Sequence, residues 1–184
     1  MAKRTLRNPK TGETITFLKT SRDTNGELFQ MGYTMSPHAA IADEHSHPHQ
    51  EMIIKVLSGT LTCTIDGRDE KIGAGKEILI PAGVNHFQRN DSDVEVQALE
   101  EYRPALQMQE FFETLIGWSN DGKTNEAGLP GLLRLAVLQY YFKHTIRSSS
   151  KKRNLISRML APIGIVLGYR REVEHYIRSA SLEQ

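Results

Sequence analysis

The sequence predicts a mainly β domain, a sandwich or barrel, followed by an α-helical extension. Residues 12–100 contain short segments rich in Val, Ile, Thr, Phe and Tyr, and turn residues separate them at close, even spacing. Asp66-Gly67 lies between two of these segments and is a strong hairpin signal. After Pro104 the apolar residues recur at helical spacing. We therefore divide the chain into a β-barrel domain, 1–103, and a helical extension, 104–184.

The expected strands share β-branched or aromatic residues bordered by glycine, proline, asparagine or aspartate. In chain order they are 13–18, 27–35, 52–59, 59–67, 76–83 and 94–100. The extension is expected to begin with a helix over 105–118, because its apolar residues fall on one helical face. A second helix is expected over 129–147. The segment 155–178 is expected to form either one helix broken near Pro162 or two shorter helices.

Composition restricts the class of protein. The chain has 184 residues and a net charge of +1, so it lacks the basic excess of a dedicated nucleic-acid binder. Cys63 is the single cysteine, which excludes an intramolecular disulfide. The basic start is not followed by the apolar stretch of a secretory signal, and no run reaches the roughly 18 apolar residues of a membrane span. We expect a cytoplasmic protein.

The charge is distributed unevenly. Residues 1–128 hold 13 Lys and Arg against 19 Asp and Glu, a balance of −6, whereas residues 129–184 hold 10 against 3, a balance of +7. We favour the interpretation that the extension packs on the acidic part of the protein or is simply exposed to solvent. The alternative is that it contacts an anionic membrane surface. For its apolar segment "RMLAPIGIVLGYRR", packing on the barrel or on a second subunit is favoured over anchoring at a membrane interface.

The stretch "HSHPHQEM", residues 45–52, places three histidines at alternate positions before a carboxylate. On a strand, alternate side chains share a face, so His45, His47 and His49 can point the same way. Neutral imidazole is the commonest metal-ligating side chain. A histidine cluster in a solvated loop is the alternative for this stretch taken alone.

A second stretch, "GKEILIPAGVNHFQRN", resembles the second sequence motif of the cupin superfamily, G-x5-P-x-G-x2-H-x3-N, at all five fixed positions. "HSHPHQEMIIKVLSG" matches the first cupin motif, G-x5-H-x-H-x3,4-E-x6-G, in part. The resemblance covers residues 45–90. It implies a cupin-type double-stranded β-helix, or jelly roll, and a divalent metal, Fe, Mn, Ni or Zn, held by His45, His47 and His86, with Glu51 completing the set.

The first motif departs from the family pattern. Ala39 stands at the position of the leading glycine, and seven residues rather than six separate Glu51 from Gly59, so Met52 falls on the family's glutamate position. Strand alternation places Met52 inward and Glu51 outward, unless a bulge near Gln50 shifts the register. The alternatives are three histidines plus water, with Met52 as a soft wall, or His49 as a substitute ligand.

Three further residues are expected to bind a substrate. Gln88 has the same strand parity as His86, Tyr33 has the parity of a barrel-lining residue, and Met52 lies beside the site.

The resemblance implies a metal-dependent enzyme acting on a small molecule, an oxidoreductase such as a dioxygenase, or an isomerase. The alternative is a non-catalytic binding module whose extension mediates partner or membrane-surface contact. A polar cavity favours catalysis, and a filled barrel favours the module. By analogy we expect a homodimer.

Overall fold

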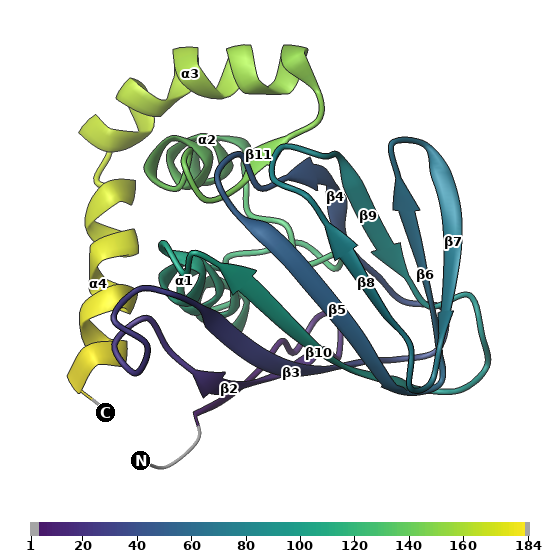
Figure 1. Cartoon of the computed structure of the whole chain (residues 1–184). Coiled ribbons are helices and arrows are strands. Elements are labelled where there is room, and N and C mark those ends of the chain that lie inside the picture. The colour runs from purple at the N-terminus through teal and green to yellow at the C-terminus, as the bar shows by residue number, and fades with distance from the viewer. Residues whose placement is uncertain (1–3, 183–184) are drawn as a thin grey trace.

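The structure, a computed structural model, describes residues 4–182. Within this range the strands form two antiparallel sheets, ordered β1-β2-β3-β10-β5-β8 and β11-β4-β9-β6-β7 (Figure 1). The strands are β1 Thr5–Arg7, β2 Thr14–Lys19, β3 Phe29–Met35, β4 Ala40–Ser46, β5 Glu51–Ser58, β6 Thr60–Ile65, β7 Arg68–Gly73, β8 Glu77–Ile80, β9 His86–Arg89, β10 Val96–Arg103 and β11 Arg147–Ser148. The predicted mainly β jelly roll is confirmed.

Alternate side chains of the strands fill the space between the sheets. In β5, Met52, Ile54 and Val56 are buried, whereas Lys55 and Leu57 are exposed. The register expected from the sequence is therefore the one that the structure shows. The β6–β7 hairpin also forms as expected, because Asp66 and Gly67 both adopt positive φ, 45° and 79°.

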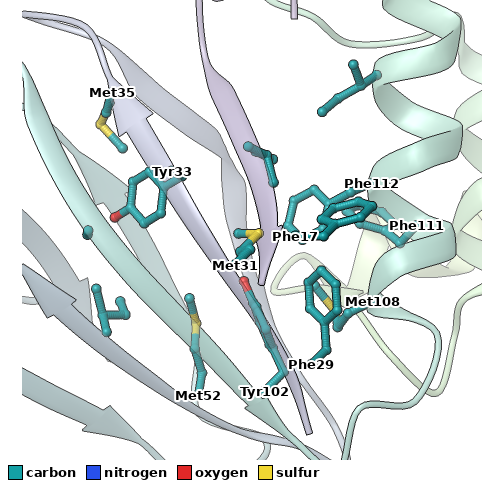
Figure 2. Close-up of a cluster of buried hydrophobic side chains, with 14 of the residues drawn as sticks. Phe17, Phe29, Met31, Tyr33, Met35, Met52, Tyr102, Met108, Phe111 and Phe112 are labelled. Carbon is teal, nitrogen blue, oxygen red and sulfur yellow. The ribbon is translucent and has the colours of Figure 1, made fainter. Parts of the chain in front are cut away.

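Four helices follow β10 in the described part of the chain: α1 Met108–Asn120, α2 Leu132–Tyr141, α3 Lys151–Val166 and α4 Tyr169–Leu182. Helix α1 turns its apolar face towards the barrel interior and buries Met108, Phe111 and Phe112. Figure 2 shows Phe112 beside Phe29 of β3, with ring centroids 6.3 Å apart. The core of the barrel therefore continues into the extension.

Two expectations about the extension are corrected. The helix expected over 129–147 ends at Tyr141, and β11 follows it as an edge strand that pairs with β4. The expected break near Pro162 does not occur there, since α3 continues through Pro162 and the chain turns at Gly168, whose φ is 92°. Pro162 is exposed, so the carbonyl that it leaves without a partner can bond to water.

A half-buried polar contact connects three of the helices. The carboxylate of Glu172 in α4 accepts hydrogen bonds from Nε1–H of Trp118 in α1 at 3.0 Å and from Nε–H of Arg134 in α2 at 2.9 Å. None of the helices in residues 4–182 is long and apolar enough to cross a membrane. β10 ends at Arg103, where the sequence analysis placed the division, and the division into a barrel domain and an extension remains a prediction.

Candidate metal centre

The structure brings together three histidines from two neighbouring strands. His45 lies near the end of β4, His47 follows that strand, and His86 begins β9. Because β4 pairs with β9 in a register that sets His45 opposite His86, the two sequence motifs meet at one place. One ligand nitrogen of each ring lies within 4.8 Å of the other two.

The hydrogen bonds of the rings determine which nitrogen is free. Nδ1 of His45 lies 2.8 Å from the carbonyl oxygen of Asp43, and Nδ1 of His86 lies 3.1 Å from that of Val84. A carbonyl oxygen accepts but does not donate, so both Nδ1 atoms carry the proton. The lone pair of each ring therefore resides on Nε2.

The Nδ1 atom of His47 is also protonated, and its hydrogen-bond partner lies far along the chain. Its Nδ1–H donates to the carbonyl oxygen of Thr145, between α2 and β11, at 2.8 Å. The Nε2 atoms of His47 and His86 are buried and have no hydrogen-bond partner among the described residues. Buried polar atoms without a partner are costly, so these two nitrogens are available to accept a ligand.

Burial also keeps the rings neutral. Loss of hydration lowers the pKa of His45 to about 4 and, with a contribution from His45, that of His86 to about 4. Burial, followed by repulsion from the other two rings, holds the pKa of His47 well below its ordinary value. All three rings are thus neutral at physiological pH, the form that binds a metal.

The donor set fits a divalent transition metal. Three neutral imidazoles each offer one ring nitrogen within 4.8 Å of the other two, and each ring donates Nδ1–H to a backbone carbonyl, as metal-ligating histidines ordinarily do. Three protein ligands leave coordination positions for water or substrate, which is the pattern of a catalytic site. Imidazole accepts Fe, Mn, Ni and Zn alike, so the metal stays unspecified.

Glu51 is not among the residues that the structure gathers at this point. It starts β5 opposite Arg103 of β10, whereas Met52 points into the core and is 1% exposed. The observed irregularity lies in β4, between Ile41 and His45, and not near Gln50. A ligand role for Glu51 remains a prediction. His49 faces the ring of His144 with centroids 5.7 Å apart, away from the three-histidine group.

A cavity of about 80 Å³ adjoins the histidines. Its wall includes His45, His47 and Gln88 together with side chains of α1 and of the loop before α2. Gln88 thus lies where the sequence predicted it. Tyr33 donates to Oε1 of Gln88 at 3.1 Å, and Sδ of Met52 lies 3.9 Å from Nε2 of Gln88, so these residues reach the cavity through Gln88. Their roles in substrate binding remain predictions.

The sequence reasoning missed an acidic group in the same cavity. Glu100 of β10 lines the wall and is 2% exposed, and Glu13 lies at the rim. Tyr102 donates to Oε2 of Glu100 at 2.5 Å, while Oε1 of Glu100 has no hydrogen bond of normal geometry to a described residue. The ring of Tyr102 packs edge-to-face on His47 at 5.0 Å and so connects this carboxyl group to the histidines. Figure 2 shows Tyr33, Tyr102 and Met52 in this interior.

The acidic group has an unusual proton affinity. Burial raises the pKa of Glu100 to about 7, and the hydrogen bond from Tyr102 offsets part of that effect. Burial and the neighbouring charge of Glu100 likewise raise the pKa of Glu13 to about 7. Strand alternation could have identified Glu100, because Glu100 and Tyr102 lie on the same face of the strand as the buried residues Val96 and Ala98. No sequence pattern indicated that the backbone carbonyl of Thr145 would accept the hydrogen bond from His47.

The family model described as "Cupin domain" matches residues 32–101, from β3 to β10. Protein SchB from Streptomyces halstedii is 35% identical over 54 residues, which are 29% of this chain and 39% of that protein. The match therefore spans well under half the length of this curated relative.

Several solved structures match about half of this chain at low sequence identity. KdgF from Halomonas sp. is 13% identical, with a TM-score of 0.48, and the match covers 54% of this chain and 84% of that one. An RmlC-like cupin from Shewanella frigidimarina is 19% identical, with coverage of 55% and 85% and a TM-score of 0.48. A predicted oxalate decarboxylase from Thermotoga maritima is 16% identical, with coverage of 56% and 93% and a TM-score of 0.48.

Proposed function

We propose a function from the premise that residues 32–101 form a cupin domain. From this premise we propose that the protein is a metal-dependent enzyme that transfers a proton at carbon in a small carbonyl compound, as an isomerase-type reaction requires. One observation carries the proposal: two of the three clustered histidines, His45 and His47, line the same cavity as Glu100, a carboxyl group with a pKa of about 7.

The histidines have a holding role. Backbone carbonyls fix the tautomer and orientation of His45, His47 and His86, whose ligand nitrogens lie within 4.8 Å of one another. A divalent ion bound there supplies Lewis-acid polarisation of a substrate oxygen. The rings themselves do not exchange protons at neutral pH, because their pKa values lie well below it.

Glu100 has the proton-carrying role. With a pKa of about 7, its carboxyl group is present in both protonation states at neutral pH, which is the condition for efficient general acid–base catalysis. Tyr102 holds Oε2, which leaves Oε1 to take a proton from a substrate carbon and return it. Apolar side chains in the wall, including Met31, Met35 and Phe111, exclude water from this exchange.

The cavity restricts the substrate to a small molecule. About 80 Å³ accommodates a handful of waters or a compound of a few carbon atoms. The same small volume, covered by α1, is what a non-catalytic binding module would also show, and this module is the alternative function. A dioxygenase is the remaining enzymatic possibility, because three imidazoles also suit Fe.

Hydrogen–deuterium exchange at carbon tests the proposal. The chain loaded with Mn²⁺ or Zn²⁺ is incubated in D2O with small 2-oxo acids and enolisable ketones, and the C–H signals are followed by proton NMR. We expect metal-dependent exchange in the wild type and a loss of about 10²-fold or more in Glu100→Gln, whose metal content stays unchanged. The matched control is Glu101→Gln, the adjacent carboxylate, which pairs with Arg103 outside the cavity.

The outcomes separate the candidate functions. Equal exchange in Glu100→Gln and wild type contradicts the assigned role of Glu100. Binding of the compounds without exchange favours the module. Oxygen consumption by the ferrous protein, without exchange under anaerobic conditions, favours the dioxygenase.

A further inference from the structure

Helix α3 has the reverse of the polarity expected for a helix packed on a core. The face that it buries consists of small residues, Ser157, Ala161 and Gly164. Ile156, Leu160 and Ile165 are half-buried, whereas four other large apolar side chains point outward and form an exposed stripe. The stripe comprises Leu155, 59% exposed, Met159, 67%, Ile163, 51%, and Val166, 87%. At spacings of three and four residues these side chains lie on one side of the helix.

Close packing fixes this orientation. A Cβ atom on Gly164 would lie 2.6 Å from Cγ2 of Val137 and 3.0 Å from the carbonyl oxygen of Leu133, both in α2. The hydroxyl of Ser157 donates to Oε1 of Gln139, also in α2. A rotation that buried the stripe would drive large side chains into this narrow contact, so the stripe stays outward. Figure 1 shows α3 on the far side of α2 from the barrel.

The surroundings of the stripe are basic. Residues 127–171 contain nine Lys and Arg and no Asp or Glu. Lys151, Lys152 and Arg158 on α3 are exposed, and no ion pair found among the described residues involves them. Arg170 and Arg171, also exposed, follow the far end of the helix, and Arg170 forms an ion pair with Glu174. Cations therefore lie at both ends of the apolar stripe.

We propose that α3 docks on an anionic lipid surface, with the stripe at the headgroup–acyl boundary and the flanking lysines and arginines among the headgroups. An exposed apolar face with basic flanks and no acidic residue is the pattern of an interfacial helix. Each cation near an anionic surface strengthens binding by about fivefold. This assignment reverses the preference for a protein partner that the sequence alone suggested.

Charge argues against a second copy as the occupant. In a two-fold symmetric contact the same patch meets itself. A parallel pairing of two α3 helices would set Lys151 against Lys151, and an antiparallel pairing would set it near Arg170 and Arg171. Both arrangements bring like charges together, whereas anionic headgroups neutralise them.

Vesicle co-sedimentation of the full chain tests the proposal. We expect binding to phosphatidylcholine vesicles that contain about one-third phosphatidylglycerol, weak binding to pure phosphatidylcholine, and release by high salt. Met159→Glu is expected to weaken binding at least tenfold. The matched control is Val94→Glu, which makes the same charge change at a barrel residue that is 58% exposed, and is expected to bind as the wild type does. Circular dichroism and thermal unfolding verify that both variants are folded.

Several outcomes overturn the proposal. Absence of binding to the anionic vesicles does so directly, and equal binding to both vesicle types removes the role of the basic residues. Equal weakening by Met159→Glu and Val94→Glu shows a general charge effect rather than docking of α3. A concentration-dependent dimer in light scattering that Met159→Glu alone dissociates assigns the stripe to a second copy.

Discussion

At the scale of single residues, the position of one proton decides what His47 can bind. Its Nδ1–H is held by the carbonyl of Thr145, so Nε2 presents a lone pair to the cavity. Were the tautomer reversed, Nε2 would be a donor and the ring could not ligate a cation. The same constraint acts on His45 and His86, and the site is therefore set for a ligand before one arrives.

Glu100 makes the stability of the metal-free protein dependent on pH. Its pKa rises from about 4.5 in the unfolded chain to about 7 in the fold, so the folded state holds the proton more tightly. The stabilisation is complete below the unfolded pKa and is lost as the pH rises through about 7. Urea denaturation should show the wild type losing about 2 kcal/mol relative to Glu100→Gln between about pH 5 and pH 8.

The reference for this measurement is Glu101→Gln, whose carboxylate lies in an ion pair near the surface. Its stability should follow that of the wild type at every pH. A wild type and a Glu100→Gln variant with parallel pH profiles would show that the carboxyl group of Glu100 does not hold a proton in the fold.

Much of the residue-level site could be predicted from the sequence. His45, His47 and His86 follow from strand parity and motif spacing, and the structure brings them together. The same argument could have identified Glu100, because it is the one charged residue on the buried face of its strand. The role of Thr145 was not accessible, because a backbone carbonyl has no residue signature and lies 98 positions from His47.

At the scale of elements, the edge strand β11 connects the extension to the metal centre. Arg147 and Ser148 pair with Ser46 and His45 of β4, and N–H of Ser149 donates to the carbonyl of Glu44 at 3.1 Å. Ser149→Pro removes this donor. We expect it to lower metal affinity about tenfold, as loss of a supporting contact around a ligand does, with isothermal titration calorimetry as the measurement.

Ser149→Ala is the matched control, because it keeps the backbone N–H and removes the side chain alone. It should bind metal as the wild type does. Unchanged affinity in a folded Ser149→Pro variant would show that β11 does not position His45 and His47.

The contact between α2 and α3 gives a second prediction for an element. Gly164→Ala places a methyl group 2.6 Å from Val137, and we expect it to lower the free energy of unfolding by about 1–3 kcal/mol, although alanine favours helix. Gly131→Ala, where a Cβ meets open space, should change it little. Urea denaturation measures both, and a stabilised Gly164→Ala variant would contradict the close packing.

Element boundaries in the extension were harder to predict than the strands. Proline suggested a break at Pro162, but an exposed position lets water replace the lost hydrogen bond, and Gly168 provides the turn instead. The short pairing of β11 depends on the distant edge of β4 and has no local pattern. Alternation in β5, by contrast, is local and predicted the buried face correctly.

At the scale of the whole molecule, the barrel and the extension form one structural unit around the cavity. Helix α1 contributes Phe111 and Phe112 to the cavity wall, and the loop before α2 contributes Leu129. The barrel supplies the three clustered histidine rings, and the extension supplies the carbonyl of Thr145 and covers the cavity. Sequence reasoning divided the chain between residues 103 and 104 and treated the extension as peripheral to the chemistry.

Metal stoichiometry tests the central claim most directly. Chelator-treated protein is titrated with Mn²⁺, Fe²⁺, Ni²⁺ and Zn²⁺ by calorimetry, and bound metal is measured by elemental analysis after desalting. We expect about one ion per chain for the wild type and for His175→Ala, an exposed histidine of α4, and loss of that ion in His47→Ala and His86→Ala. Wild-type protein that binds none of these metals, or a His47→Ala variant that binds them as tightly, would contradict the account.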